Sequence, residues 1–260
     1  MIKNSATHQH AINSVVEILK ECTSILFITG AGISVDSGLP TYRGIGGLYE
    51  NEDTEDGMPV ESALSAATLD SDPSITWKYL SQIERNCRGA TFNRAHEIIT
   101  EMQHRFDRVW ILTQNIDGFH TAAGSTNTIE IHGNVYDLKC MQCDWRQTVK
   151  DYSALKIPPT CPQCSAFIRP DVVLFGEMLD VNKLQLYRNE LRKGFDLYVW
   201  IGTTGVFPYI QSPLYELQYT TAKTVEINPD HTVLTDDMDI KIPLGAAEAL
   251  SLIWEQYEQK

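Results

Sequence analysis

The chain has 260 residues and a formal net charge of -13, and 43% of its residues are hydrophobic. These values predict a well-buried core in one large domain or two unequal ones, and they disfavour nonspecific binding to DNA, RNA or anionic lipid. An acidic surface favours a cationic partner such as a lysine-rich segment, although acidity often serves solubility alone. No run of about 18 apolar residues and no apolar signal core is present, so we expect a cytoplasmic protein without a membrane span.

The N-terminal part of the chain is predicted to form a helix, a strand and a glycine-rich loop. Apolar residues recur at helical spacing over 11–20, and the β-branched and aromatic run 25–29 predicts a buried strand. This strand is followed by Gly30-Ala31-Gly32, where small residues would let the backbone approach a pyrophosphate. Val35 stands where the dinucleotide fingerprint has its third glycine, so the loop alone indicates a phosphate site and an ordinary strand-to-helix turn equally well.

Residues 44–90 show no strand pattern and are instead predicted to form loops and helices. Gly44 to Gly47 is predicted to form a hinge, and the acidic run 51–57 is predicted to be a solvated loop. Helical patterns follow over 74–85 and 93–103. The chain is therefore expected to leave the sheet after its first strand and to return with the second of these helices.

Polar and ionisable residues follow the ends of the later predicted strands. The strand 109–113 is followed by Gln114 to Asp117, and the strand 128–131 by His132. The strands 197–201 and 223–227 end in the same way, and the residues after them are Gly202, Thr203, Thr204 and Asn228. Open α/β sheets bind ligands at the carboxyl ends of their strands, so these residues predict a ligand crevice. Turn formation, helix capping or a structural hydrogen bond is the alternative role for each of them.

Four of the six cysteines form two close pairs of the type Cys-x2-Cys: Cys140, Cys143, Cys161 and Cys164. Each pair can place two sulfurs on one side of a tetrahedron, so the spacing predicts a structural zinc site with four thiolate ligands. A redox motif would normally occur once, and a disulfide framework would be unusual in a chain of this size without a secretion signal. Cys22 and Cys87 lie outside the pattern and are expected in the core.

The alternation of helices and strands, closed by a helical pattern at 245–255, predicts an α/β protein with a Rossmann-like, mostly parallel, doubly wound sheet. The cysteine segment, with little periodicity, interrupts this alternation as an insertion. We therefore expect a discontinuous large domain and a smaller module with a helical part and a zinc-ribbon part. The large domain would comprise residues 1–43, 91–134 and 193–260, and the smaller module residues 44–90 and 135–192.

In this order, the motifs resemble those of the sirtuins, the NAD-dependent protein lysine deacylases. Gly30 to Gly44 is similar to the family's cofactor loop, Thr113 to Gly118 matches its Thr-Gln-Asn-Ile-Asp-Gly motif, and Ile131 to Gly133 matches its catalytic His-Gly. The cysteine pairs follow directly, as in the family, and Val172 to Glu177 resembles its peptide-binding Phe-Gly-Glu segment. The resemblance covers most of the chain, and chance agreement of so many ordered motifs is implausible.

The resemblance implies a role for each matching residue. His132 and Asn115 would be catalytic, and the four cysteines would bind structural zinc. The co-substrate NAD would be bound by a larger set, of which the last member has the weakest match: Gly30, Ala31, Gly32, Ser34, Tyr42, Arg43, Gln114, Asn115, Ile116, Asp117, Gly202, Thr203, Thr204, Asn228 and Asp239. An acyl-lysine protein or peptide would be bound by Val172, Val173, Phe175, Gly176 and Glu177.

The implied reaction transfers the acyl group of a protein lysine to ADP-ribose and releases nicotinamide. An amide oxygen can capture the ribosyl cation if nicotinamide departs from NAD in a dry, oriented pocket, which gives an alkylimidate. A base must then deprotonate a ribose hydroxyl, and His132 suits this step because imidazole titrates near neutral pH. By resemblance, Asn115 positions a water or a ribose hydroxyl, and Asp117 with Ile116 holds the nicotinamide carboxamide.

Two features of the sequence bear on the acyl group. The family's commonest loop has Asp-Phe-Arg where this chain has Thr41-Tyr42-Arg43, and some members that lack the negative charge prefer longer or acidic acyl groups. Members that remove succinyl or malonyl groups carry a Tyr-x-x-Arg pair, which does not occur here before Ala90, since Gln82 stands three residues after Tyr79. We therefore expect neutral acyl groups to be preferred, acetyl first, with Lys78 as a possible source of charge for an acidic group.

Three other functions remain open from the sequence. One is NAD-dependent mono-ADP-ribosyl transfer to a protein, which needs NAD cleavage but no acyl-lysine tunnel. Another is a deacylase that prefers acidic acyl groups, a desuccinylase or demalonylase. The third is a zinc-ribbon module that recruits nucleic acid, and the net charge of -13 argues against it. We expect acyl-lysine proteins or peptides as partners, no direct nucleic-acid or membrane partner, and a monomer.

Overall fold

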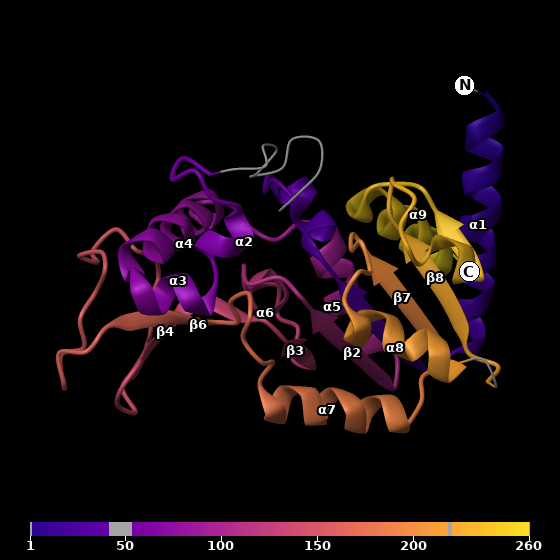
Figure 1. The fold of residues 1–260 in the computed structure, drawn as a ribbon. Coiled ribbons are helices and arrows are strands. Elements are labelled where there is room, and N and C mark those ends of the chain that lie inside the picture. The colour runs from indigo at the N-terminus through magenta and orange to yellow at the C-terminus, as the bar shows by residue number, and fades with distance from the viewer. Residues whose placement is uncertain (1, 42–53, 218–219, 260) are drawn as a thin grey trace.

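The fold comes from a computed structural model, which describes residues 2–41, 54–217 and 220–259, without the side chains of residues 2–7. Two parts lie side by side, one built on a six-stranded sheet and the other on short helices and a three-stranded sheet (Figure 1). Among the described residues, no helix combines the length and the apolarity that a membrane span requires.

All strand pairs of the larger sheet are parallel. Its order is β3 (Thr128–Glu130), β2 (Arg108–Thr113), β1 (Ser24–Thr29), β7 (Leu197–Ile201), β8 (Lys223–Ile227) and β9 (Ile240–Ile242). The strand order reverses between β1 and β7, which is where doubly wound sheets bind their ligands. The predicted Rossmann-like sheet is confirmed, and β9 is a short strand that the sequence pattern did not reveal.

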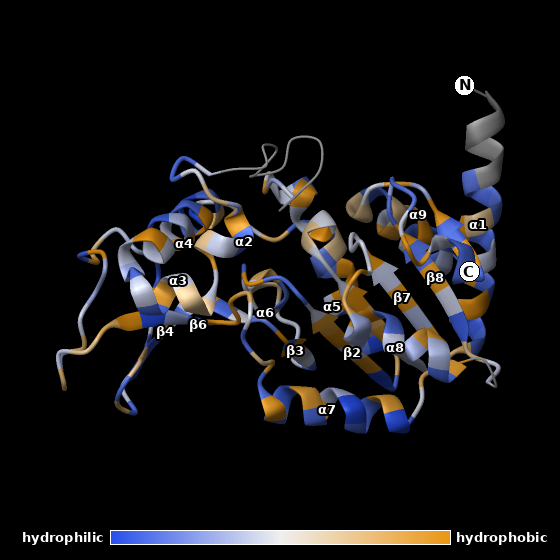
Figure 2. Cartoon of the chain, in the orientation of Figure 1, coloured by the Kyte–Doolittle hydropathy of each residue, from blue (hydrophilic) through white to orange (hydrophobic). Residues whose placement is uncertain are grey.

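Helices cover both faces of this sheet, which explains why the centre of β1 is continuously apolar. Ile25 and Phe27 face one helical layer, whereas Leu26 and Ile28 face the other. The first layer consists of α1 (Ile2–Glu21), α5 (Arg94–Arg105) and α9 (Ala246–Glu258), and the second of α7 (Val181–Arg192) and α8 (Pro208–Leu217). Strands buried on both faces favour such unbroken hydrophobic runs. Figure 2 shows hydrophobic residues along β2, and alternating hydrophobic and hydrophilic residues along α7.

The smaller part combines helices with an antiparallel sheet. Its helices are α2 (Val60–Ala63), α3 (Ala66–Ser71) and α4 (Pro73–Cys87), and its sheet has the order β5 (Arg146–Thr148), β4 (Gly133–Cys140) and β6 (Ile168–Val172). Trp77 of α4 is fully buried against this sheet, and its indole N–H donates to Ile168 O. The cysteine segment, which has little periodicity in the sequence, thus lies within a three-stranded sheet. β4 pairs with β6, which is far along the chain, so no local pattern marks the pairing.

The predicted C-terminal boundary of the smaller module is wrong. The helix α7 falls inside the predicted range 135–192, but its Tyr187 and Leu191 are buried with Leu26 and Trp200 of the six-stranded sheet. An amphipathic helix must cover its apolar face, and here the larger sheet provides the partner. The smaller module therefore ends before α7, and the rest of the domain division remains a proposal.

Candidate active site

Two glycine-containing loops meet where the strand order reverses. The N–H of Gly30 donates to Ile201 O over 3.0 Å, and the N–H of Gly32 donates to Gly202 O over 2.9 Å. A Cβ on Gly32 would lie 2.5 Å from the Cα of Gly202, so no larger residue fits there. The close approach of the two loops therefore requires glycine. The chain after β1 continues as the 3₁₀ helix η1 (Ala31–Ser37), not as an α-helix.

Ser34, Asn115 and Asp117 form one hydrogen-bond network. Ser34 Oγ donates to Asp117 Oδ2 over 2.7 Å, and Asn115 Nδ2 donates to Ser34 Oγ over 3.2 Å. Asn115 Nδ2 also lies 3.2 Å from Gly30 O, and Asp117 Oδ1 accepts the N–H of Phe119. Burial raises the pKa of the Asp117 carboxyl, and these donors partly oppose it. Asp117 thus supports the start of the short helix α6 (Phe119–Ala122) and binds the loop after β1.

Gln114, Thr203 and Asn228 connect the ends of three strands of the larger sheet. Gln114 Nε2 donates to Thr203 Oγ1 over 2.8 Å, and Asn228 Nδ2 donates to Thr203 O over 3.1 Å. These residues follow β2, β7 and β8, so all three stand at the carboxyl edge of the parallel sheet. Thr204, next to them, is exposed to solvent, while Ile116 and Ala31 are half-buried. The structure thus brings most of the predicted cofactor residues to one edge.

His132 is held through both of its ring nitrogens. Nδ1 lies 2.9 Å from Gln114 O, and Nε2 lies 2.6 Å from Tyr209 Oη. A carbonyl oxygen can only accept, so Nδ1 carries a proton. Burial lowers the pKa of His132, the charge of Lys183 adds to this, and the bond to Gln114 opposes it. A neutral imidazole whose Nε2 lone pair accepts hydrogen bonds can act as a general base.

The predicted substrate segment 172–177 lies directly beside His132. The N–H of Val173 donates to His132 O over 2.8 Å, and Val172 pairs with Gly133 across β6 and β4. Phe175 is bound from the other side, because its N–H donates to Leu64 O over 2.9 Å. The segment therefore connects the helices of the smaller part with the residue that follows β3.

Glu177 stabilises this segment from within. Its carboxylate accepts two hydrogen bonds from the Arg169 guanidinium, at 2.5 and 3.0 Å, and one from the N–H of Leu174 at 2.8 Å. Burial would raise the pKa of Glu177, but Arg169 and the Leu174 N–H hold it below its usual range. In this arrangement Glu177 shapes the turn at Gly176, where φ is +83°, and directs its carboxylate towards Arg169.

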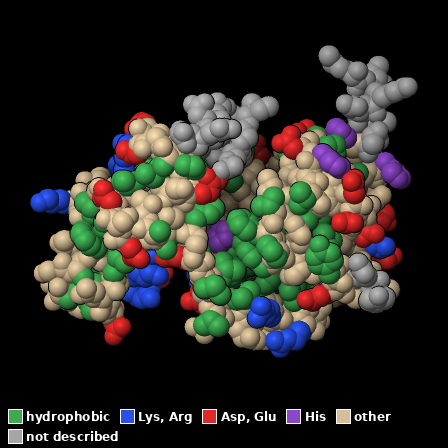
Figure 3. Space-filling view, in the orientation of Figure 1, with side chains coloured by type: hydrophobic (Ala, Val, Ile, Leu, Met, Phe, Trp, Pro, Cys, Tyr) green, Lys and Arg blue, Asp and Glu red, His purple; other side chains and the backbone are tan. Residues whose placement is uncertain are grey.

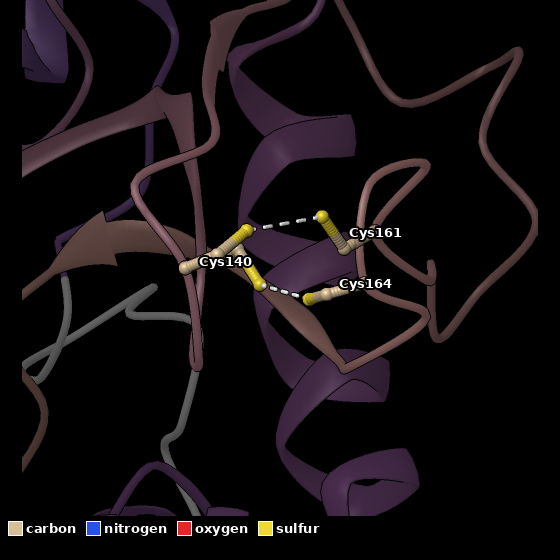
Figure 4. A group of neighbouring side chains, drawn as sticks. Cys140, Cys161 and Cys164 are labelled. Atoms are coloured by element: carbon tan, nitrogen blue, oxygen red, sulfur yellow. Dashed lines mark hydrogen bonds between the residues drawn. The ribbon is translucent and has the colours of Figure 1, made fainter.

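The four paired cysteines converge in the smaller part (Figure 4). The Sγ atoms of Cys140 and Cys164 lie 3.4 Å apart, those of Cys143 and Cys161 lie 3.6 Å apart, and all four lie within 4.8 Å of one another. Backbone N–H groups two residues after Cys140 and Cys161 donate to their sulfurs. Four thiolates bound tetrahedrally at about 2.3 Å from zinc would be roughly 3.8 Å apart. The predicted cluster therefore fits a closed zinc site with no position for substrate.

Asp239 does not join the predicted cofactor residues. Its carboxylate accepts hydrogen bonds from the N–H and Oγ1 of Thr224, at 2.9 and 3.0 Å. Both residues stand where β8 and β9 begin, because Val225 is paired in parallel with Ile240. The candidate site lies at the other edge, so the assignment of Asp239 to the cofactor is contradicted. Tyr42 and Arg43, also assigned to the cofactor, lie outside the described residues.

Two residues of the site were missed by sequence reasoning. Tyr209, near the start of α8, reaches a histidine 77 positions earlier, and it stands in none of the motifs. Arg169 of β6 is 5% exposed and binds Glu177. Arg169 could have been recognised as a charged residue within a short apolar stretch. No local feature of the sequence marks Tyr209 as a residue of the site.

A family model described as the Sir2 family matches residues 30–208. An NAD-dependent protein deacylase 2 from Pseudomonas aeruginosa is 44% identical to this chain over 234 residues, which covers 89% of this chain and 91% of that protein. A protein with the same name from Pseudomonas syringae pv. tomato is 43% identical over 236 residues, with coverage of 90% and 95%.

Solved structures of Sir2 proteins have a similar fold. A mutant Sir2 homologue in complex with 2′-O-acetyl ADP ribose matches with a TM-score of 0.85 and 29% identity, over 95% of this chain and 96% of that one. A Sir2 homologue in complex with NAD matches with a TM-score of 0.84 and 29% identity, over 95% and 94%. The matched family model spans more than half of the chain and confirms the resemblance seen in the motifs. This chain belongs to the Sir2 family.

Proposed function

We propose that this chain is an NAD-dependent protein lysine deacylase, which transfers the acyl group to ADP-ribose and releases nicotinamide. The observation that carries the proposal is the place of His132, between the carboxyl edge of the parallel sheet and the segment 172–177. Figure 3 shows a histidine and several hydrophobic side chains at the surface where the two parts of the molecule meet. The curated relatives carry the name NAD-dependent protein deacylase.

The residues at the sheet edge would divide the binding of NAD among them. The glycine-containing loop after β1 would let a phosphate approach the backbone, and Thr203 and Asn228 stand at the ends of β7 and β8. The Asp117 carboxylate would accept the carboxamide N–H of nicotinamide, with Ser34 fixing its orientation. When bound, NAD supplies a ribose carbon from which nicotinamide can depart. His132 would then take the proton of a ribose hydroxyl at Nε2.

A peptide is the proposed second substrate. A Sir2 structure with a p53 peptide and NAD+ covers 95% of this chain with a TM-score of 0.81, and its contents support a peptide site here. The segment 172–177 lies next to His132, so an acyl-lysine held against it would reach the same edge of the sheet as NAD. A dry, oriented site favours capture of the ribosyl carbon by a weak nucleophile such as an amide oxygen.

A neutral acyl group is the proposed preference. Lys78 Nζ lies 2.8 Å from Asp56 Oδ2 and 3.2 Å from Glu55 Oε2, and Tyr79 Oη donates to the same Asp56 oxygen over 2.5 Å. Two carboxylates thus already compensate the charge of Lys78. A succinyl carboxylate would compete with both of them, and Gln82 stands where a Tyr-x-x-Arg pair would place its guanidinium. Acetyl is therefore favoured over succinyl or malonyl.

The zinc proposed for the four cysteines would be structural. Four thiolates complete a tetrahedron, so the metal would take no part in the reaction. It would hold the loop after β4 against the loop before β6, and β6 leads directly into the segment 172–177. The metal would therefore affect activity through the folding of the smaller part.

The alternative activity, the partners, the compartment and the oligomeric state are proposed on separate grounds. Mono-ADP-ribosyl transfer is disfavoured by the presence of both His132 and the segment 172–177, which that reaction does not need. The charge of -13 argues against a nucleic-acid partner. Free Cys22 and Cys87, together with four cysteines arranged for a metal, fit a reducing compartment such as the cytoplasm. The monomeric state can be tested by light scattering.

Mass spectrometry of an acetyl-lysine peptide incubated with the protein, with and without NAD, tests the activity. We expect free lysine peptide and O-acetyl-ADP-ribose only in the presence of NAD. A peptide or protein that gains ADP-ribose while keeping its acetyl group would favour the transferase instead. No change in either substrate would refute both enzymatic proposals.

A further inference from the structure

Tyr209 is the only side chain among the described residues that hydrogen-bonds Nε2 of His132. The phenol oxygen lies 2.6 Å from this nitrogen, and the tyrosine comes from α8, behind the loop that follows β7. Nε2 is the atom at which the proposed reaction needs a free lone pair. The phenol therefore stands between this nitrogen and any proton that it is to accept.

The direction of this hydrogen bond follows from the other side of the ring. Gln114 O can only accept, so the proton of a neutral His132 resides on Nδ1, and Nε2 carries a lone pair. The phenol must then be the donor to Nε2. Burial raises the pKa of Tyr209 and lowers that of His132, which keeps both groups neutral at pH 7. Among the described residues, no donor reaches the phenol oxygen, so no protein group occupies its lone pairs.

Tyr209 is fixed in this position by contacts on several sides. Its ring stacks on Phe207, with centroids 5.7 Å apart and planes at 17°. Its backbone oxygen accepts hydrogen bonds from Tyr187 Oη at 3.3 Å and Ser212 Oγ at 3.2 Å. The ring also packs against the buried cluster under α7 and α8. A side chain held in this way is better suited to staying beside His132 than to leaving when a substrate arrives.

We infer that Tyr209 relays the proton from the substrate hydroxyl to His132, as a further catalytic residue. The inference rests on the proposed deacylation. In this step the O–H bond of the ribose hydroxyl breaks, and its electron pair stays on that oxygen, which becomes the nucleophile. The released proton binds Tyr209 Oη while the phenol's own proton passes to His132 Nε2. The phenol ends neutral, the imidazole ends protonated, and no further reactant is needed.

Tyr209→Phe tests the relay, because it removes one oxygen atom and keeps the ring against Phe207. We expect kcat for deacetylation to fall roughly 10²-fold, the lower range for a positioned proton-transfer group. Exchange of labelled nicotinamide into NAD should be unchanged, since nicotinamide departs before the base acts. The KM for NAD should stay close to that of the wild type. Tyr215→Phe is the matched control, as Tyr215 lies on the same helix, is 65% exposed and donates to Gln211.

The outcomes separate the relay from simpler roles. Unchanged kcat with a lower KM for NAD would mean that the phenol merely occupies Nε2, and it would overturn the relay. Equal losses of exchange and deacetylation would overturn it too, because they indicate a structural role. If the variant does not fold, 3,5-difluorotyrosine at position 209 replaces it: a kcat altered several-fold supports the relay, and an unaltered kcat refutes it. A wild-type protein without deacetylation would refute the proposed function itself.

Discussion

Ser34 Oγ donates a 2.7 Å hydrogen bond to Oδ2 of Asp117, joining the loop after β1 to the loop after β2. Asp117 is buried, and burial raises the pKa of its carboxyl group. The hydrogen bond from Ser34 opposes this shift because it stabilises the charged carboxylate. A hydrogen bond to a charged group contributes about 1.5–3 kcal/mol, and its loss would leave the carboxylate less oriented.

Ser34→Ala should therefore weaken NAD binding about 10- to 100-fold, the affinity change that corresponds to this free energy. Titration calorimetry with NAD, together with the KM for NAD, measures the effect. Ser71→Ala is the control, because Ser71 Oγ donates to Thr68 O at an exposed helix end far along the chain. Wild-type affinity in Ser34→Ala would show that Asp117 does not contact the cofactor through this network.

His132→Ala should fold and bind both zinc and NAD, yet lose deacylation by about 10²- to 10⁴-fold. The loss follows from removing the group whose Nε2 lone pair accepts a proton and whose Nδ1 is fixed by Gln114. Single-turnover assays that separate nicotinamide release from product formation measure it. Turnover near that of the wild type would disprove the role of His132 as base.

The zinc site should control folding of the smaller part. Cys161→Ala, or treatment with a strong chelator, should unfold the region around β4, β5 and β6, because metal binding in such sites contributes roughly 10–16 kcal/mol in model peptides. Metal content by mass spectrometry and near-UV circular dichroism report the change. Met141→Ala, at a residue 43% exposed between two of the cysteines, should have little effect. A folded, metal-free and fully active Cys161 variant would contradict the prediction.

Two buried histidines predict a loss of stability in mild acid. The ring centroids of His96 and His120 lie 4.8 Å apart, and in each ring one nitrogen has no hydrogen-bond partner among the residues that the structure describes. Burial lowers the pKa of His96 to about 4 and that of His120 well below its usual range, where the charge of His96 adds to the effect. The folded state therefore binds fewer protons than the unfolded state as the pH falls from about 6.5.

The contribution of these two histidines to the free energy of unfolding should consequently be constant above about pH 7 and fall between about pH 6.5 and 4, by up to about 3 kcal/mol from His96 alone. Urea unfolding at pH 7.5, 6.0 and 5.0 measures this dependence. His96→Gln should reduce the slope, although it can also lower stability at every pH. An unchanged slope in that variant would exclude His96 as its source.

The acyl preference can be tested with matched peptides. Because Lys78 is paired with Glu55 and Asp56, we expect kcat/KM for acetyl-lysine to exceed that for succinyl-lysine at saturating NAD. The difference should be at least about 10-fold, since an unpaired carboxylate in the site costs more than about 1.4 kcal/mol. Lys78→Ala should leave the acetyl rate unchanged. Equal or faster turnover of the succinyl peptide would indicate a cation that these contacts do not reveal.

Local patterns were sufficient for five of the six strands of the larger sheet and for the metal site. Buried parallel strands require continuous apolar runs, so the strand at 197–201 and the strand at 223–227 have the same limits in the structure as in the sequence. The Cys-x2-Cys spacing alone predicts a four-thiolate cluster, because each pair can place two sulfurs on one side of a tetrahedron. The ordered motifs identified the family.

Only the tertiary structure decided relationships between distant residues. Pairing of β4 with β6, packing of α7 on the larger sheet and the place of Asp239 at the amino edge all depend on contacts that no local pattern contains. The hydrogen bond between Tyr209 and His132 also depends on such a contact. In the sequence, a tyrosine after a proline indicates only the start of a helix, and the fold places its oxygen 2.6 Å from the imidazole nitrogen. Sequence determines which surfaces must be buried, whereas packing in three dimensions determines which polar atoms then meet.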